Sequence, residues 1–213
     1  EGGRVQRFRT EFTEVPAMAE IAGREHPEEA FRAAGQVLAE ELREVGVDLT
    51  FAPVLDINYG RSSVIGNRSF GKNSLEVIKN AGAFIEGLAD AGMASCGKHF
   101  PGHGWAEADS HIALPTDERS VEALERDMEP YRAIKKLASV MTAHVSYEAY
   151  HGELATFSST LLKKVLREEL GFDGLIFSDD LSMKAAVVDT IVDRAEHALK
   201  AGCDMVLICN HPE

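Results

Sequence analysis

The segment 98–115, KHFPGHGWAEADSHIALP, concentrates side chains that can move protons. Within it Asp109 and His111 are two positions apart, so in an extended conformation both side chains project to the same side. A carboxylate beside one imidazole nitrogen fixes the tautomer of the ring and raises its proton affinity. We therefore interpret His111 as a general acid/base and Asp109 as its partner. The alternative is a turn-capping aspartate beside an ordinary surface histidine.

A second candidate is the pair of carboxylates in IFSDDLSM, Asp179 and Asp180. Because they are adjacent they point in different directions, so one can face a substrate while the other caps the following segment. A carboxylate can attack an anomeric carbon and stabilise the oxocarbenium-like transition state. Asp179 with His111 fits a double displacement, which needs a nucleophile and an acid/base on opposite sides of the scissile bond. The alternative is that both aspartates are helix caps.

Cationic and imidazole groups near these segments are candidates for holding a substrate. Arg68 in IGNRSFG and Arg7 after the opening glycines could each bind hydroxyls or a carboxylate in a planar fork, whereas surface ion pairing is the default interpretation of a lone arginine. His144, which closes VMTAH, is a substrate contact or a core histidine bonded to backbone. We favour the second interpretation.

These groups follow short apolar runs that predict buried strands. Continuous rather than alternating apolar strands, separated by helical patterns, indicate a parallel sheet covered by helices, which is the α/β class. The carboxyl ends of such strands line ligand sites. The predicted strands are 49–54, 94–97, 139–143, 174–177 and 205–209, and the polar groups that follow them are Asp56 and Asn58, Lys98 and His99, His144, Asp179 and Asp180, and Asn210.

Helical patterns lie between the strands. Proline is tolerated at the first helical position, so Pro27 is expected to open a helix, whereas Pro130 is expected to interrupt one. No linker or low-complexity segment divides the chain, so we expect one domain over 1–213. The predicted helices are 27–45, 74–91, one that begins near 120, 159–170 and 190–200.

The composition excludes several functional classes. The chain of 213 residues is 45% hydrophobic and has a formal charge of -13. This negative charge repels the phosphates of nucleic acid, so sequence-independent binding to nucleic acid is not expected. No apolar run approaches the roughly 18 residues of a membrane span, so no membrane partner is expected. The cysteines Cys96, Cys203 and Cys209 lack paired spacing and are expected to be reduced core thiols.

Taken together, these motifs resemble the glycoside hydrolase family three β-N-acetylglucosaminidases of bacterial peptidoglycan recycling, over nearly the whole chain. The segments that carry the resemblance are EGGRVQRF, FAPVLDIN, NRSFG, GKHFPGHG with DSHIALP, MTAHVSY and ELGFDGLIFSDDLSM. The resemblance implies that His111 is the acid/base, Asp109 its partner and Asp179 the nucleophile. It implies that the substrate contacts are Arg68, Lys98, His99 and Arg7.

The resemblance also implies a (β/α)₈ barrel, of which this chain carries the last five strands. The first three strands and the final helix of the barrel would lie outside this chain. The family's substrate-binding aspartate just upstream of EGGR would then precede Glu1. In place of the family's acidic residue before Arg68 stands Asn67. No cofactor is implied, the expected partner is a carbohydrate containing N-acetylglucosamine, and the expected location is the cytoplasm. Nothing in the sequence indicates an oligomeric state.

The leading hypothesis is a retaining exo-glycosidase that removes terminal β-linked N-acetylglucosamine from muropeptides. Phosphate in place of water would make the same site a phosphorylase. A rival from another class is a metal-dependent amide or ester hydrolase. A further alternative is a sugar-binding protein without catalytic activity. The candidate ligands of the metal-dependent site are His99, His103, Asp109, His111 and His144.

Overall fold

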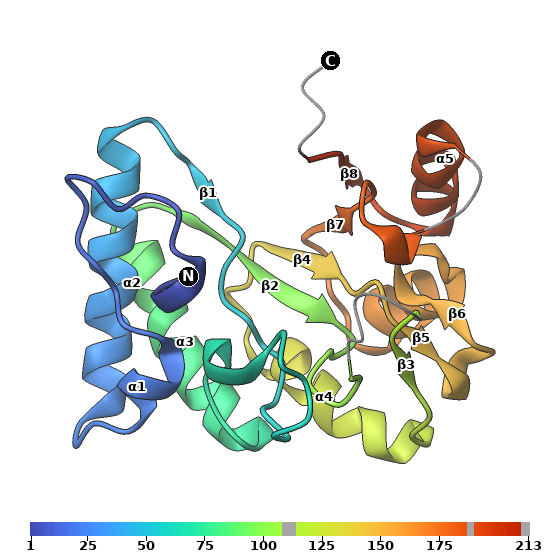
Figure 1. Ribbon diagram of the computed structural model, residues 1–213, viewed down its shortest axis with the longest axis horizontal. Helices are drawn as coiled ribbons and strands as arrows, with labels where there is room; N and C mark the ends of the chain where they lie inside the picture. The colour runs from blue at the N-terminus through green and yellow to red at the C-terminus, as the bar shows by residue number, and fades with distance from the viewer. Residues whose placement is uncertain (108–113, 187–189, 210–213) are drawn as a thin grey trace.

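The computed structural model describes residues 1–107, 114–186 and 190–209. Five parallel strands form a curled sheet in the order β1-β2-β4-β7-β8 (Figure 1). The predicted parallel α/β sheet is therefore confirmed. The strands are β1 (Leu49–Thr50), β2 (Ala94–Phe100), β4 (Ser139–Thr142), β7 (Leu175–Asp180) and β8 (Met205–Leu207).

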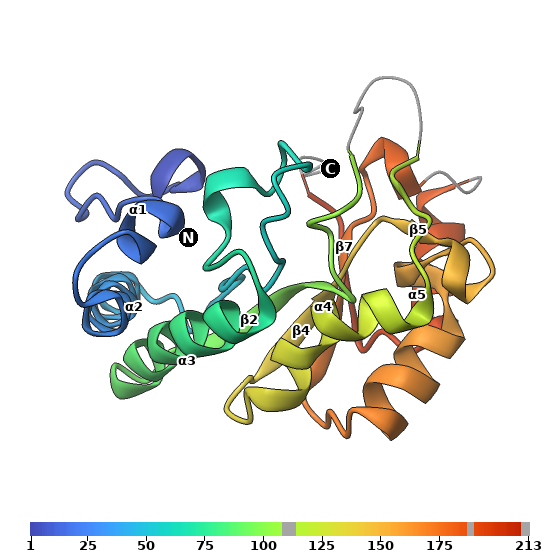
Figure 2. The same ribbon diagram turned by 90° about the horizontal axis from the view of Figure 1, so that it is seen from below.

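Helices α1 and α2 precede β1, and the later helices alternate with the strands; Figure 2 shows α3 and α4 covering one face of the sheet. The helices are α1 (Met18–Ala22), α2 (Pro27–Glu44), α3 (Ser74–Asp90), α4 (Val121–Ala133), the π-helix η5 (Thr160–Glu169) and α5 (Ile191–Ala201). Short 3₁₀ segments are η1 (Gly3–Val5), η2 (Gly66–Arg68), η3 (Glu148–Tyr150), η4 (Ala155–Phe157) and η6 (Lys184–Ala186).

Polar side chains before the helices explain where several of them begin. The side chain of Asn73 accepts a hydrogen bond from the Glu76 amide at the start of α3. Ser120 does the same for α4, and Thr190 forms a capping box with Asp193 at the start of α5. Each cap satisfies backbone N–H groups that have no partner within the helix.

Helices α2 and α3 pack with their backbones in close contact. A Cβ at Gly35 would lie 2.2 Å from the carbonyl oxygen of Phe84, and one at Gly87 would lie 2.0 Å from that of Arg32. Only glycine permits this approach. Beneath it, Phe31 and Phe70 stack with ring centroids 4.9 Å apart in the main core.

The structure differs from the sequence predictions in several places. Helix α4 continues through Pro130 to Ala133, because the proline ring and the following Tyr131 are buried and only one ladder hydrogen bond is lost. Strand β1 is shorter than predicted, although Val54 still forms an isolated bridge with Lys98. Cys96 and Cys203 are buried free thiols as expected, but Cys209 is exposed.

A second, three-stranded sheet was not predicted. It consists of β3 (Thr116–Asp117), β5 (Ser146–Tyr147) and β6 (Glu153–Leu154), with β3 parallel and β6 antiparallel to β5. Strands of two residues leave no periodic pattern in the sequence. Its strands belong to the segments that follow β2 and β4, the strands whose ends carry several of the predicted site residues.

No helix among the residues that the structure describes is both long enough and apolar enough to cross a membrane.

Candidate active site

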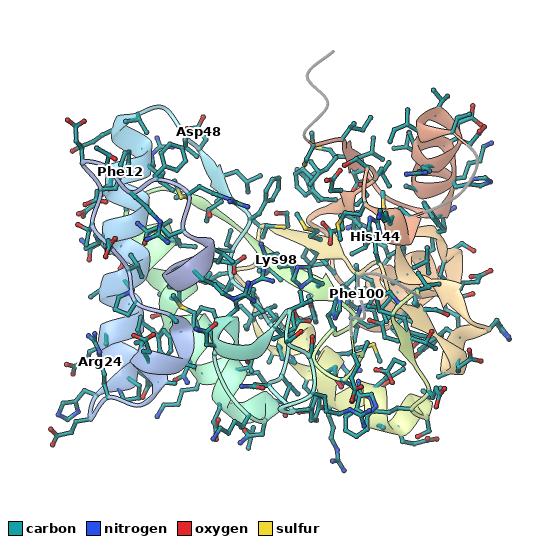
Figure 3. The ribbon with its side chains drawn as sticks, in the orientation of Figure 1. Phe12, Arg24, Asp48, Lys98, Phe100 and His144 are labelled. Atoms are coloured by element: carbon teal, nitrogen blue, oxygen red, sulfur yellow. The ribbon has the colours of Figure 1, made fainter. Side chains whose placement is uncertain are left out.

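A largely buried carboxylate, that of Glu1, pairs with two of the predicted substrate-binding cations. The guanidinium of Arg68, at the end of η2, donates from Nε and Nη2 to Glu1 Oε2 and Oε1 at 2.8 and 3.0 Å. Lys98 on β2 forms an ion pair with the same carboxylate, and Figure 3 shows Lys98 beside the N-terminal turn. The side chains of all three residues are 10 to 12% exposed.

The charges of this group depend on one another. Burial alone raises the pKa of the Glu1 carboxyl, but the charges of Lys98 and Arg68 and the Arg68 hydrogen bonds outweigh it and hold that pKa well below its usual range. Burial opposes the charge of Arg68, while Glu1, with smaller contributions from Asp56 and Asp179, raises its pKa. The carboxyl of Glu1 and the guanidinium of Arg68 are therefore both ionised at neutral pH.

The imidazole of His99 is held by a second buried carboxylate, Asp56, which follows the first predicted strand. Asp56 Oδ2 lies 2.7 Å from His99 Nδ1, and Oδ1 accepts the backbone N–H groups of His99 at 3.2 Å and His103 at 2.7 Å. Because an ionised carboxylate only accepts hydrogen bonds, the proton is on Nδ1, which leaves Nε2 of His99 as the nitrogen that can meet a substrate.

Asp56 stays ionised although it is 1% exposed. Burial raises the pKa of its carboxyl, but the charge and hydrogen bond of His99, and then His103, hold the pKa below its usual value. The ring of His103 lies edge-on to that of His99 with centroids 5.9 Å apart. Burial and the neighbouring His99 lower the pKa of His103, and its buried Nδ1 has no hydrogen-bond partner among the described residues.

The two adjacent aspartates at the end of β7 have different surroundings. Asp180 accepts hydrogen bonds at Oδ1 from the amides of Ser182 and Cys209, at 2.9 and 3.0 Å, and at Oδ2 from the Ser182 hydroxyl at 2.7 Å. Among the described residues, the carboxylate of Asp179 accepts one hydrogen bond, at Oδ1, from the Asp180 amide at 2.8 Å. Asp180 therefore caps the turn, whereas Oδ2 of Asp179 accepts no hydrogen bond from the described residues.

His144 has a structural role, as the sequence interpretation favoured. Its ring is 2% exposed, with Nδ1 2.8 Å from Thr156 Oγ1 and Nε2 3.0 Å from the carbonyl oxygen of Asp180. Both ring nitrogens are engaged, so His144 has none left for a metal ion. Over the described residues, no group of three or more His, Cys, Asp or Glu side chains is arranged to hold a metal.

Three of the four substrate-binding residues predicted from the sequence lie around one cavity. A cavity of about 540 Å³ is bordered by Arg7, Arg68 and Lys98, and its other walls are mostly apolar. Arg7 is exposed, whereas His99 lies on β2 directly after Lys98. The structure thus places three of the four predicted contacts around this cavity, and His99 is not among the residues that line it. Asp109 and His111 lie outside the described residues.

Two carboxylates in this arrangement were not assigned a role from the sequence. Glu1 precedes the glycines of EGGR, and Asp56 was noted only as a strand-end residue. Asp56 is buried, the Glu1 side chain is 10% exposed, and each makes hydrogen bonds to residues more than 40 positions away. An acidic residue at the end of an apolar run is the signal that could have identified Asp56, whereas nothing local distinguishes Glu1.

Known proteins resemble this chain along its whole length. A sequence profile described as the glycosyl hydrolase family 3 N-terminal domain matches residues 1–213. A protein named Beta-hexosaminidase from Thiobacillus denitrificans is 51% identical over 222 residues, covering 100% of this chain and 62% of that protein. A Beta-hexosaminidase from Pseudomonas aeruginosa is 52% identical, covering 99% of this chain and 64% of that protein.

Solved structures show the same similarity. NagZ from Neisseria gonorrhoeae in complex with N-trifluoroacetyl-D-glucosamine superposes with a TM-score of 0.94 at 49% identity, covering 100% of this chain and 64% of that one. A family 3 β-N-acetylglucosaminidase from Paenibacillus gives a TM-score of 0.89 at 39% identity, covering 98% and 41%. This chain thus spans less than two thirds of the length of these relatives. It belongs to glycosyl hydrolase family 3 and matches the N-terminal domain of that family along its whole length.

Proposed function

We propose that this chain carries the catalytic site of a retaining exo-β-N-acetylglucosaminidase, which removes terminal β-linked N-acetylglucosamine from peptidoglycan fragments in the cytoplasm. The observation that carries the proposal is that Arg68, Lys98 and His99 are each paired with a largely buried carboxylate, while the charge of Asp179 at the end of β7 acts on Arg68. The names of the relatives support a hexosaminidase, and one relative was solved with an N-acylated glucosamine bound.

The proposed fold of the longer protein is a (β/α)₈ barrel. Strands β1 and β8 each pair on one side only within the described residues, and the sheet between them is curled. Three further strands between β8 and β1 would close such a sheet, and a final helix would cover it. We propose that residues 1–213 form most of this catalytic domain.

In the proposed reaction Asp179 attacks the anomeric carbon while His111, oriented by Asp109, protonates the departing glycosidic oxygen. The C1–O bond to the leaving group breaks and an ester between the sugar and Asp179 forms. His111 then takes a proton from water, whose oxygen attacks C1 and releases the Asp179 carboxylate. Two displacements restore the β configuration of the product.

The remaining residues bind the sugar. The cations Arg68 and Lys98 border the cavity and can donate hydrogen bonds to hydroxyl and acetamido oxygens, whereas Nε2 of His99 can accept a hydrogen bond from a hydroxyl. Glu1 and Asp56 keep these three groups in fixed orientations, which lowers the entropy cost of binding and alignment. Because those partners are buried and charged, the arrangement exists before the substrate arrives.

The test is turnover of an aryl β-N-acetylglucosaminide by the full-length protein. We expect N-acetylglucosamine to appear first as the β anomer, observed by proton NMR before mutarotation, and the rate to be the same with and without phosphate. Release of N-acetylglucosamine 1-phosphate in phosphate buffer would instead assign a phosphorylase. Activity that is lost on chelation and restored by a divalent ion would favour the metal-dependent hydrolase, and absence of turnover would contradict the proposal.

His111→Ala should affect substrates according to their leaving groups. A natural disaccharide needs protonation of its departing oxygen, so its kcat should fall by about 10²- to 10⁴-fold. A nitrophenyl glycoside departs as a stable anion, so its first step should slow far less. Steady-state kinetics on both substrates check this, with His26→Ala as the control because His26 is exposed and its side chain makes no cap bond. An equal loss on both substrates would remove His111 from the role of acid.

A further inference from the structure

A buried ionic cluster, here called the Arg119 cluster, lies beside the loop that leaves β2. It consists of Tyr59, Trp105, Asp117, Arg119 and Asp127. The Arg119 guanidinium donates from Nε and Nη2 to Asp117 Oδ2 at 3.0 and 2.6 Å and from Nη1 to Asp127 Oδ2 at 2.9 Å. The arginine side chain is 10% exposed and both carboxylates are fully buried, so this is an internal cluster rather than a surface ion pair.

Two aromatic rings complete the cluster. The Arg119 guanidinium carbon lies 5.1 Å from the ring centroid of Tyr59 and 5.0 Å from that of Trp105. The Tyr59 hydroxyl donates to Asp127 Oδ2 at 3.1 Å, and the two rings meet edge to face at 5.4 Å. One guanidinium therefore contacts residues from the loop after β1, the loop after β2, strand β3 and helix α4.

The backbone of the loop after β2 rests directly on this cluster. A Cβ at Gly102 would lie 2.6 Å from the Cβ of Asp127, so no other side chain fits there without displacement. The carbonyl oxygen of Gly102 accepts a hydrogen bond from the Tyr147 hydroxyl at 2.8 Å. The loop is thus fixed at Gly102 and again at Trp105.

Stability alone does not account for the cluster. It holds two buried carboxylates and one guanidinium, and burial raises the pKa of the Asp127 carboxyl to about 6 despite the hydrogen bonds from Arg119 and Tyr59. Buried charges of this kind often stabilise a fold no better than apolar residues of similar volume. What they supply is geometry, because the planar fork of an arginine fixes its partners in direction as well as distance.

We propose that Arg119 is a positioning residue for the glycosidase site, holding the stretches 101–107 and 114–117 in register with each other. Trp105 belongs to the first stretch and Asp117 to the second, and both contact the same guanidinium. The chain between these stretches carries Asp109 and His111, the proposed acid/base pair. This inference rests on the proposed function, because the fixed relative position of the two stretches is argued to serve proton transfer by His111.

The test compares Arg119→Met and Arg119→Lys with Arg167→Met in the full-length protein. Arg167 is a matched control because it also pairs with an aspartate, Asp204, and donates to the carbonyl oxygens of Phe172 and Gly174, but near the opposite end of β7. For each variant, kcat/KM is measured on aryl glycosides with good and poor leaving groups. Hydrogen–deuterium exchange is measured on peptides that cover 98–120.

For Arg119→Met we expect kcat/KM on substrates with poor leaving groups to fall by about 10²-fold, which is the lower end of the range for loss of a general acid. On activated substrates we expect kcat/KM to fall less than about tenfold. Exchange should accelerate in 101–107 and 114–119 but not in α2 or α3. Arg119→Lys keeps the charge without the fork, so it should fold and show the same pattern in weaker form. Arg167→Met should lower the melting temperature and leave the leaving-group dependence unchanged.

An Arg119→Met enzyme with wild-type leaving-group dependence would overturn the inference, even if its melting temperature fell. If Arg119→Met does not fold, the same result with Arg119→Lys is decisive. A wild type that lacks glycosidase activity would refute the proposed function separately. In that case, accelerated exchange in both stretches would still support the anchoring by Arg119, and unchanged exchange would refute it.

Discussion

Replacing Asp179 by Asn should lower kcat by about 10⁴- to 10⁶-fold, as expected when a covalent nucleophile is removed. The asparagine would keep the size of the side chain and an oxygen for the Asp180 amide, which in the wild type donates to Oδ1 at 2.8 Å. The fold should therefore persist, because only the attacking charge is lost. Thermal unfolding and steady-state kinetics on an aryl β-N-acetylglucosaminide measure the two effects separately.

The neighbouring carboxylate provides the matched control for this substitution. Asp180→Asn removes the acceptor charge from a group bonded to Ser182 and Cys209, so it should lower the melting temperature with a much smaller loss of kcat. A covalent test follows from the same mechanism. Azide should restore turnover to Asp179→Ala by attacking C1 from the vacated side, with an α-glycosyl azide as product. A β-azide, or full activity of Asp179→Asn, would contradict the assignment.

Asp56→Asn should weaken both the fold and the substrate site. An amide at this position turns either its oxygen or its NH₂ group toward Nδ1 of His99, which the wild-type carboxylate meets at 2.7 Å. The amide of His103 needs an oxygen acceptor, so the asparagine oxygen faces that amide and its NH₂ group faces Nδ1 of His99. Nδ1 must then accept a hydrogen bond, so the ring proton lies on Nε2 instead. A buried sugar hydroxyl that loses its acceptor costs about 1–3 kcal/mol, which corresponds to a fall in kcat/KM of about 5- to 150-fold.

The stability effect of Asp56 has a defined pH dependence. Breaking a buried pair by removing one partner costs about 3–5 kcal/mol, so Asp56→Ala should lower the free energy of unfolding by that order at pH 7. Because the pKa of Asp56 is lowered in the folded state, its contribution is complete above the unfolded pKa of about 4 and is lost as the pH falls through the folded pKa. The difference in melting temperature between wild type and variant should therefore narrow only below about pH 4.

Asp204→Asn is the control for Asp56. Asp204 also accepts a backbone amide, that of Ile176, and pairs with a cationic side chain, Arg167, near the start of β7. Its substitution should lower stability while leaving KM unchanged, since it lies away from the carboxyl ends of the strands. Equal changes of KM in both variants would show that Asp56 acts only through the fold.

Much of the fold could be predicted from local pattern. Continuous apolar runs identified all five strands of the main sheet, and caps such as Asn73 and Thr190 explain why helices begin close to the predicted positions. Pro130 shows the limit of such reasoning. Its effect on a helix depends on whether tertiary burial compensates for one lost hydrogen bond, and burial is not encoded within a single turn.

For the site, the sequence by itself determined which chemical groups are available and that they follow strand ends, because the carboxyl ends of parallel strands meet on one side of the sheet. Only the tertiary structure decided which groups pair. Glu1 meets Arg68 across 67 positions, Asp56 meets His99 across 43, and Arg119 joins four segments. The physical reason is that the spacing of apolar residues along the sequence reflects only which face of each element is buried. The partner of a buried charge depends instead on strand order and on packing between elements that are distant in sequence.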